Sequence, residues 1–301
     1  MQAHPASAPA PLGAPARQWT PLGAAAPTAL VAARTQLHHA AQVANAAAIS
    51  LLPPEPDDSH TSFEWDARLH ALVARPAPAS MSFRFALRVA DLSLAVVRGG
   101  EIAELFSLDG RSVADGFAWA TEQVRRAGGD AAGMTMRRHF QIPGAPPDAA
   151  HPFAVHDGAA FAELAAYYGD ADALLRDVQS AMAGASEVRC WPHHFDIATL
   201  VAEPGAERAT IGIGLSPGDE HYAEPYLYVG PYPYPDTRAL PALDVGRWHT
   251  EGWVGAALTA SAIVAAGDAA AQAQLARSFV DGAVATVRRL RAGAQPLEGG
   301  A

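Results

Sequence analysis

The stretch W-P-H-H-F-D, residues 191–196, places two imidazoles beside a carboxylate. A histidine next to a carboxylate is a proton-transfer unit that works near neutral pH. Alternate side chains of a β-strand share one face, so His194 and Asp196 are expected to point the same way. This pair predicts acid–base chemistry on a small polar substrate. A structural hydrogen bond within the pair is the alternative interpretation.

A second pair with the same spacing, His249 and Glu251, lies in W-H-T-E-G-W. We predict that His194, Asp196, His249 and Glu251 are catalytic. Two histidines and one carboxylate can also hold a divalent metal such as zinc or iron, with water completing the coordination. His194, Asp196 and His249 are therefore the candidate metal ligands. The chain has no H-E-x-x-H pair, so spacing alone supports the metal only weakly.

Other polar and aromatic side chains are expected to converge on the same pocket. His38 and Gln42 share one face of a predicted helix, for which a solvated face is the alternative. Tyrosines alternate with prolines over residues 224–235, which predicts a rigid aromatic wall or, alternatively, edge-strand packing. The predicted ligand-binding residues are His38, Gln42, His60, Trp191, Glu224, Tyr228 and Trp253.

Helices and hairpins must position these side chains. An extended stretch over 83–97 is expected to turn at R-G-G-E and return over 101–108 as a second strand. Ser112 with Asp115 predicts a capping box for a helix that runs to about residue 126. Apolar periodicity predicts further helices over residues 27–52, 159–168, 171–183 and 268–291.

A second hairpin is expected to carry the W-P-H-H-F-D residues. Pairing its strands symmetrically about Gly205 sets Phe195 opposite Leu215 and Asp196 opposite Gly214, which keeps one face apolar. A glycine within a strand often marks close approach by a ligand or another backbone. We therefore expect His194 and Asp196 to lie over a shallow glycine floor that faces a cavity. A helix or loop packed on that floor is the alternative.

The order of the elements predicts one α+β domain over residues 18–292. Its sheet is expected to be mostly antiparallel and built from two hairpin-plus-helix units, with long helices near both chain ends. The Ala/Pro-rich residues 1–17 and residues 293–301 are expected to be disordered tails.

Composition narrows the cofactors and partners. The 301-residue chain has a formal charge of −10, and its 21 basic residues are all arginine. Cations are not clustered, so we expect no nucleic-acid partner. The lack of lysine excludes lysine-bound pyridoxal phosphate, and the single Cys190 excludes an iron–sulfur cluster. We expect no NAD either.

The expected partner is a small molecule. No apolar run approaches the length of a membrane helix, and the N-terminal residues lack the pattern of a signal peptide. We therefore expect no membrane partner and a cytoplasmic location. The sequence predicts no particular oligomeric state.

Several segments, taken in order, resemble an uncharacterised bacterial domain family of unknown function. The resemblance rests on L-H-H-A-A-Q at 37–42, W-P-H-H-F-D-I-A at 191–198 and E-P-Y-L-Y at 224–228, and it extends from about Trp19. The double histidine at 193–194 departs from the family's pattern. The resemblance implies an architecture and supplies no reaction.

Three functions stay open at this point. The first is an enzyme that acts on a small polar substrate by acid–base or metal-assisted chemistry. The second is a small-molecule-binding or sensory protein without catalysis. In the third, a structural or partner-binding protein, the polar residues only satisfy one another.

Overall fold

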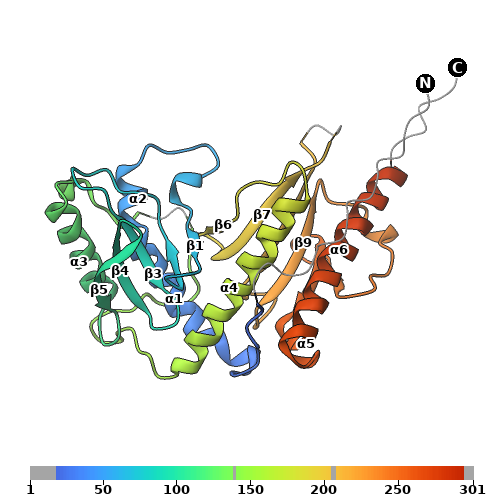
Figure 1. Cartoon of the computed structure of the whole chain (residues 1–301), viewed down its shortest axis with the longest axis horizontal. Helices are drawn as coiled ribbons and strands as arrows, with labels where there is room; N and C mark the ends of the chain where they lie inside the picture. The colour runs from blue at the N-terminus through green and yellow to red at the C-terminus, as the bar shows by residue number, and fades with distance from the viewer. Residues whose placement is uncertain (1–17, 138–139, 205–207, 295–301) are drawn as a thin grey trace, which may run out of the picture.

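The computed structural model describes residues 18–137, 140–204 and 208–294. Its strands form two antiparallel sheets, and helices pack on both (Figure 1). The predicted α+β class with mostly antiparallel sheet is confirmed. The predicted tail 1–17, and residues 295–301 of the other tail, lie outside the described residues, while residues 293–294 belong to the last helix.

The first sheet is a meander in which each strand pairs with the next along the chain. Helix α1 packs on β3, and α3 packs on α1 and α2. The hairpin predicted at R-G-G-E is confirmed as β4 and β5, whereas the stretch predicted over 83–97 is divided by a turn into β3 and β4. The elements of this half are β1 Glu64–Asp66, β2 Ala71–Val73, β3 Arg84–Arg88, β4 Ser93–Arg98, β5 Glu101–Ser107, α1 Val31–Ala44, α2 Ala46–Leu51 and α3 Val113–Arg126.

The second sheet has the order β10-β11-β9-β8-β7-β6. Helix α4 lies across β7 and β8, and α6 packs on β9 and β11 (Figure 1). Its elements are β6 Arg189–Trp191, β7 Asp196–Ala202, β8 Thr210–Ser216, β9 Tyr226–Tyr232, β10 Arg247–His249, β11 Gly255–Thr259, α4 Gly158–Ala181, α5 Ala260–Ala265 and α6 Ala269–Ala294. Short 3-10 helices cover Pro27–Leu30, Ser59–Thr61, Ala131–Gly133 and Thr237–Ala239.

The two sheets meet where β1 approaches β6. Phe63 and Cys190 exchange both backbone hydrogen bonds there, each at 2.9 Å. Buried apolar side chains from both sheets, such as Phe85 and Ile197, belong to one continuous core cluster. Within the part of the chain that is described, no helix is long and apolar enough to cross a membrane.

Local signals located most helices correctly. Ser112 accepts from the Asp115 N–H, and the Asp115 carboxylate accepts from the Ser112 N–H, so the predicted capping box of α3 is confirmed. The predicted break between 168 and 171 is wrong, because α4 is continuous. Gly169 is a contact position there: a Cβ would lie 3.6 Å from the Trp65 indole nitrogen.

The predicted register of the second hairpin is wrong by two residues. Ile197 pairs with Leu215, and Ala198 pairs with Gly214. The shift is even, so every side chain keeps its predicted face while its partner changes. Phe195 lies in the preceding turn with φ +57°, which removes it from the strand.

Candidate functional site

The stretch W-P-H-H-F-D forms the turn that joins β6 to β7. Trp191 ends β6 and pairs with Asp196, which begins β7. The Phe195 N–H donates to the Trp191 carbonyl at 2.7 Å, which closes the turn. The Tyr168 hydroxyl of α4 donates to the Phe195 carbonyl at 2.5 Å. The turn that presents His193 and His194 is thereby fixed to the helix beneath it.

Helix α1 fixes the same turn from another side. His38 Nε2 lies 2.8 Å from the Pro192 carbonyl, and Gln42 Nε2 donates to that carbonyl at 3.1 Å. A carbonyl only accepts, so His38 must carry its proton on Nε2. The His38 ring stacks on Phe195 with centroids 5.2 Å apart. Both polar residues are buried, so their helix face is not solvated, and its hydrogen bonds hold the turn in place.

A pocket of about 340 Å³ opens between this turn and α1. Its walls come from four segments: Arg34, Thr35 and His38 of α1, residues 140–143, residues 193–195 of the turn, and residues 217–220 after β8. His194 is exposed at this pocket, and its ring lies 4.6 Å from that of His193. The structure thus brings the predicted His38 and His194 to one cavity.

Asp196 follows His194 by two residues and begins β7. Its Oδ2 accepts from the Tyr228 hydroxyl at 2.5 Å. Its Oδ1 is buried and has no hydrogen-bond partner among the described residues. Burial raises the pKa of the Asp196 carboxyl, and the Tyr228 hydrogen bond and the charge of His194 oppose that rise. Asp196 is therefore electrostatically linked to His194 while its hydrogen bond goes to Tyr228.

The predicted open glycine floor does not exist. Tyr228 pairs with Gly214 across β8 and β9, and its side chain crosses over that glycine. A Cβ at Gly214 would lie 2.6 Å from the Tyr228 Oη. The glycine thus admits a tyrosine ring where we expected a ligand, and the cavity lies instead at the turn.

Arg34 is a pocket residue that the sequence analysis missed. It is partly buried, and its Nη1 makes one long hydrogen bond, at 3.5 Å, to the Pro217 carbonyl. Burial lowers the pKa of Arg34, and the charge of Asp219 opposes this most strongly. Arg34 precedes His38 by four residues, so extending the polar helix face by one turn would have found it.

Asp219, the acid with the largest electrostatic effect on Arg34, is already hydrogen-bonded. Asp219 Oδ2 accepts from the Tyr226 hydroxyl at 2.5 Å. Its Oδ1 accepts from the backbone N–H groups of His221 and Tyr222. No ion pair joins Arg34 to an acid within the described ranges, so its guanidinium faces the pocket with donors to spare.

His249 and Glu251 lie elsewhere, which corrects their assignment to the same site. Strands β8, β9 and β11 separate β10 from β7, which corresponds to about 19 Å at the usual strand spacing. His249 Nε2 lies 2.5 Å from the Glu251 carbonyl, and Nδ1 lies 3.2 Å from the Tyr222 hydroxyl. Both ring nitrogens are therefore occupied by protein groups. The Glu251 side chain is exposed and does not line the pocket.

An aromatic cluster surrounds His249. Its ring stacks on Trp253 at 4.3 Å, and Trp253 stacks in turn on Tyr226 at 6.1 Å. Tyr226, Tyr228 and Trp253 thus pack against one another, and none of them lines the pocket, so they do not form the predicted wall of that pocket.

The predicted metal ligands are not assembled. Among residues 18–137, 140–204 and 208–294, no three His, Cys, Asp or Glu side chains are placed to hold a metal ion. His194 and Asp196 are neighbours, whereas His249 is bound into the aromatic cluster. The prediction that these three residues share one metal is therefore wrong.

The remaining predicted ligand-binding residues have local contacts of their own. His60 Nδ1 accepts from the Glu55 N–H at 3.1 Å, within the loop before β1. Glu224 Oε2 accepts from the Ser261 N–H at 2.5 Å and so caps α5. The Trp191 ring lies 6.1 Å from that of His193.

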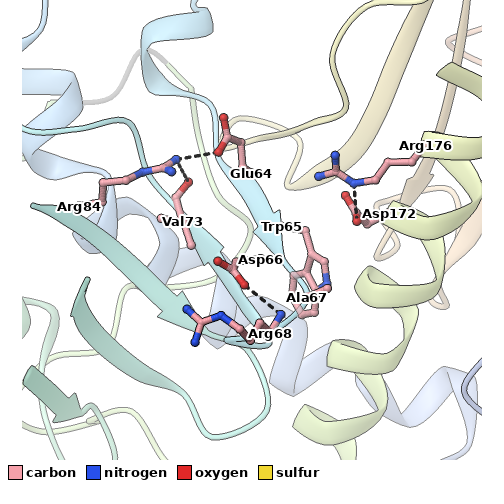
Figure 2. Close-up of a pocket in the computed structure, with 9 residues that line it drawn as sticks. All are labelled: Glu64, Trp65, Asp66, Ala67, Arg68, Val73, Arg84, Asp172 and Arg176. Carbon is pink, nitrogen blue, oxygen red and sulfur yellow. Dashed lines mark hydrogen bonds and ion pairs between the residues drawn. The ribbon is translucent and has the colours of Figure 1, made fainter. Parts of the chain in front are cut away.

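A second groove lies between the first sheet and α4 (Figure 2). It has about 330 Å³ and a floor formed by Trp65. Its arginines are paired: Arg84 with Glu64 at 2.9 Å, Arg176 with Asp172 at 2.8 Å, and Arg68 with Glu101 at 2.8 Å. These arginines already have acidic partners and need no ligand to neutralise their charge. The pocket beside Arg34 is therefore the better candidate site.

Comparison with known proteins gave no match: no family model, no curated protein and no solved structure is similar to this chain. The resemblance to an uncharacterised bacterial family therefore stays a prediction.

Proposed function

We propose that the protein binds a small polar molecule in the pocket between α1 and the β6–β7 turn, and that His194 exchanges a proton with it. The observation that carries this proposal is the position of His194. Its imidazole is exposed to the pocket, and its charge acts on the buried carboxyl of Asp196, two residues further along the chain. An imidazole paired with a carboxylate is suited to general acid–base catalysis near neutral pH.

In this proposal the two residues have different roles. His194 touches the bound molecule and gives or takes the proton. Asp196 does not line the pocket, so it acts as a positioning residue whose carboxyl interacts electrostatically with the imidazole. Tyr228 holds the Asp196 carboxyl in place with its hydrogen bond. Removal of Asp196 should therefore shift the pH profile of the reaction more than it weakens binding.

Binding without catalysis is the second candidate function. One observation favours it: His249 and Glu251 lie outside the pocket, which leaves His194 as the one predicted catalytic side chain that lines it. The His38 ring is already hydrogen-bonded to the Pro192 carbonyl.

The test uses wild type, His194→Gln and the control His249→Gln. Each is incubated with a mixture of small carboxylates, amines and phosphate esters, and mass spectrometry follows loss of each compound and appearance of products. Acid–base catalysis predicts a compound that wild type and His249→Gln convert and that His194→Gln converts at least tenfold more slowly. A compound that wild type retains on gel filtration but never converts supports the binding protein. Equal conversion by wild type and His194→Gln excludes the proposed role.

A further inference from the structure

We propose that Arg34 is the anchor for a carboxylate group of the pocket's ligand, so that the molecule bound there is a small organic acid or an amino-acid-like zwitterion. This inference rests on the proposed function, because it names the chemistry of the ligand of the same pocket. It adds a binding residue that no motif of the sequence pointed to.

The first observation concerns the hydrogen-bond donors of Arg34. A guanidinium has five N–H donors, arranged so that two of them match the oxygens of a carboxylate. In the described part of the chain, Arg34 uses one of them, in a 3.5 Å bond to the Pro217 carbonyl. Two other partly buried arginines do pair with acids: Arg84 with Glu64 at 2.9 Å, and Arg288 with Glu203 at 2.8 Å. Arg34 thus has the burial of a paired arginine without the pair.

The second observation is that the loop after β8 is shaped around this guanidinium. Gly218 has φ +109°, a backbone conformation that residues with a Cβ rarely adopt. A Cβ built there would overlap Arg34 Nη1 and would lie 2.8 Å from the Tyr222 carbonyl oxygen. The Gly218 N–H donates to Ser216 Oγ at 3.1 Å, which fixes the loop. The guanidinium is therefore seated against bare backbone on one side and open to the cavity on the other.

The charges around Arg34 favour a carboxylate over a phosphate. Asp219 and Glu220 lie on the same loop and line the pocket, and both act on Arg34 electrostatically. A group with a single negative charge meets less repulsion from these acids than a doubly charged phosphate does. Glu220 is exposed, and its carboxylate oxygens suit an ammonium or hydroxyl group of the same ligand. His193 and His194 are the other titratable groups on the facing wall.

The test measures the melting temperature of wild type, Arg34→Gln and the matched control Arg176→Gln. Each is heated in sodium acetate, sodium phosphate or sodium chloride at equal ionic strength. A ligand that binds only the folded state stabilises it by mass action. At tenfold excess over its dissociation constant, acetate should raise the melting temperature of wild type and of Arg176→Gln by about 3 °C over chloride. Arg34→Gln should show no such rise.

Three outcomes overturn the inference: equal melting of wild type in acetate and chloride, an acetate effect that survives in Arg34→Gln, or a larger effect from phosphate than from acetate. If Arg34→Gln does not fold, phenylglyoxal modification of wild type gives the answer, with peptides identified by mass spectrometry. Acetate should slow modification of Arg34 at least twofold over chloride and leave Arg176 unchanged. Equal rates at Arg34 would contradict the anchor.

The variant His194→Gln separates this inference from the proposed function. If it loses conversion and keeps the acetate effect, both proposals hold. If it loses conversion while wild type shows no acetate effect, the proton-transfer role stands and the anchor fails. If no compound is converted and the acetate effect depends on Arg34, the anchor stands in a binding protein.

Discussion

Tyr228 on β9 reaches across β8, above Gly214, and donates its hydroxyl to Asp196 on β7 at 2.5 Å. Three strands are thus linked by one side chain, which passes through the space that the missing Cβ of the glycine leaves. The contact fixes the carboxyl immediately after the turn that presents His194 to the pocket. The glycine strip therefore serves the site indirectly, by admitting the tyrosine that holds Asp196.

Gly214→Ala should destabilise the fold by about 2 kcal/mol, as expected for an overpacked core position. The new Cβ would lie 2.6 Å from the Tyr228 Oη and 2.7 Å from the Ile197 carbonyl oxygen, which cannot move without breaking the ladder. Urea unfolding monitored by circular dichroism measures the change. Gly230→Ala is the control, because a Cβ there meets nothing within 4 Å, and it should change stability by less than about 0.5 kcal/mol. Equal effects of the two substitutions would refute the crossing.

Asp196 should make the protein less stable as pH rises. Its pKa is raised in the folded state, mainly by burial, so the folded protein binds more protons than the unfolded chain does above about pH 4. Stability from this group is complete below the unfolded pKa and is lost as pH rises through the folded pKa. The free energy of unfolding of wild type minus that of Asp196→Asn should therefore fall with rising pH. A difference that increases with pH would show that the carboxyl is stabilised in its charged form.

His38 and Gln42 should act as one unit. Both donate to the Pro192 carbonyl. Loss of one of them leaves this carbonyl with one donor, and loss of both leaves it with none. His38→Phe keeps an aromatic ring against Phe195, and Gln42→Ala removes the second donor. The double variant should lose about 1 kcal/mol more stability than the sum of the singles, measured by a double-mutant cycle. Strict additivity would mean that the two donors do not share the carbonyl.

His249→Ala should cost stability of about 2 kcal/mol and leave conversion or binding in the pocket unchanged. The imidazole stacks on Trp253 and uses both nitrogens within its own cluster. Glu251→Ala should change neither property, because the contact to His249 uses the backbone carbonyl of Glu251 and not its carboxylate. Thermal unfolding and the compound assay check both variants. Loss of conversion in His249→Ala, with its stability intact, would restore the catalytic assignment.

Local sequence signals predicted the frame better than the site. The capping box at Ser112 and Asp115 involves only four consecutive residues, and the turn between β4 and β5 is encoded by its two glycines, so both could be found in the sequence. The alternation of residues in β7 gave the correct face for Asp196. It could not give the register, because a shift by two residues preserves the alternation.

The spacing of the chemically capable residues was informative only within one turn. His194 and Asp196 belong to one hairpin, so their proximity follows from the sequence. His249 has the same spacing to its own carboxylate, but the order of the strands places it far from β7, and no sequence pattern encodes that order. Arg34 was missed because nothing near it in the sequence marks it as a binding residue. Its role depends on the contact with Gly218, which only the fold creates.

A crystal structure of the protein soaked with a compound that it converts or retains would locate the bound molecule directly. Electron density for that compound is expected between Arg34 and His194, beside Gly218, with a carboxylate on the guanidinium and the reacting atom within hydrogen-bond reach of the imidazole. Density over Trp65 in the ion-paired groove, with the pocket beside Arg34 empty, would contradict this expectation.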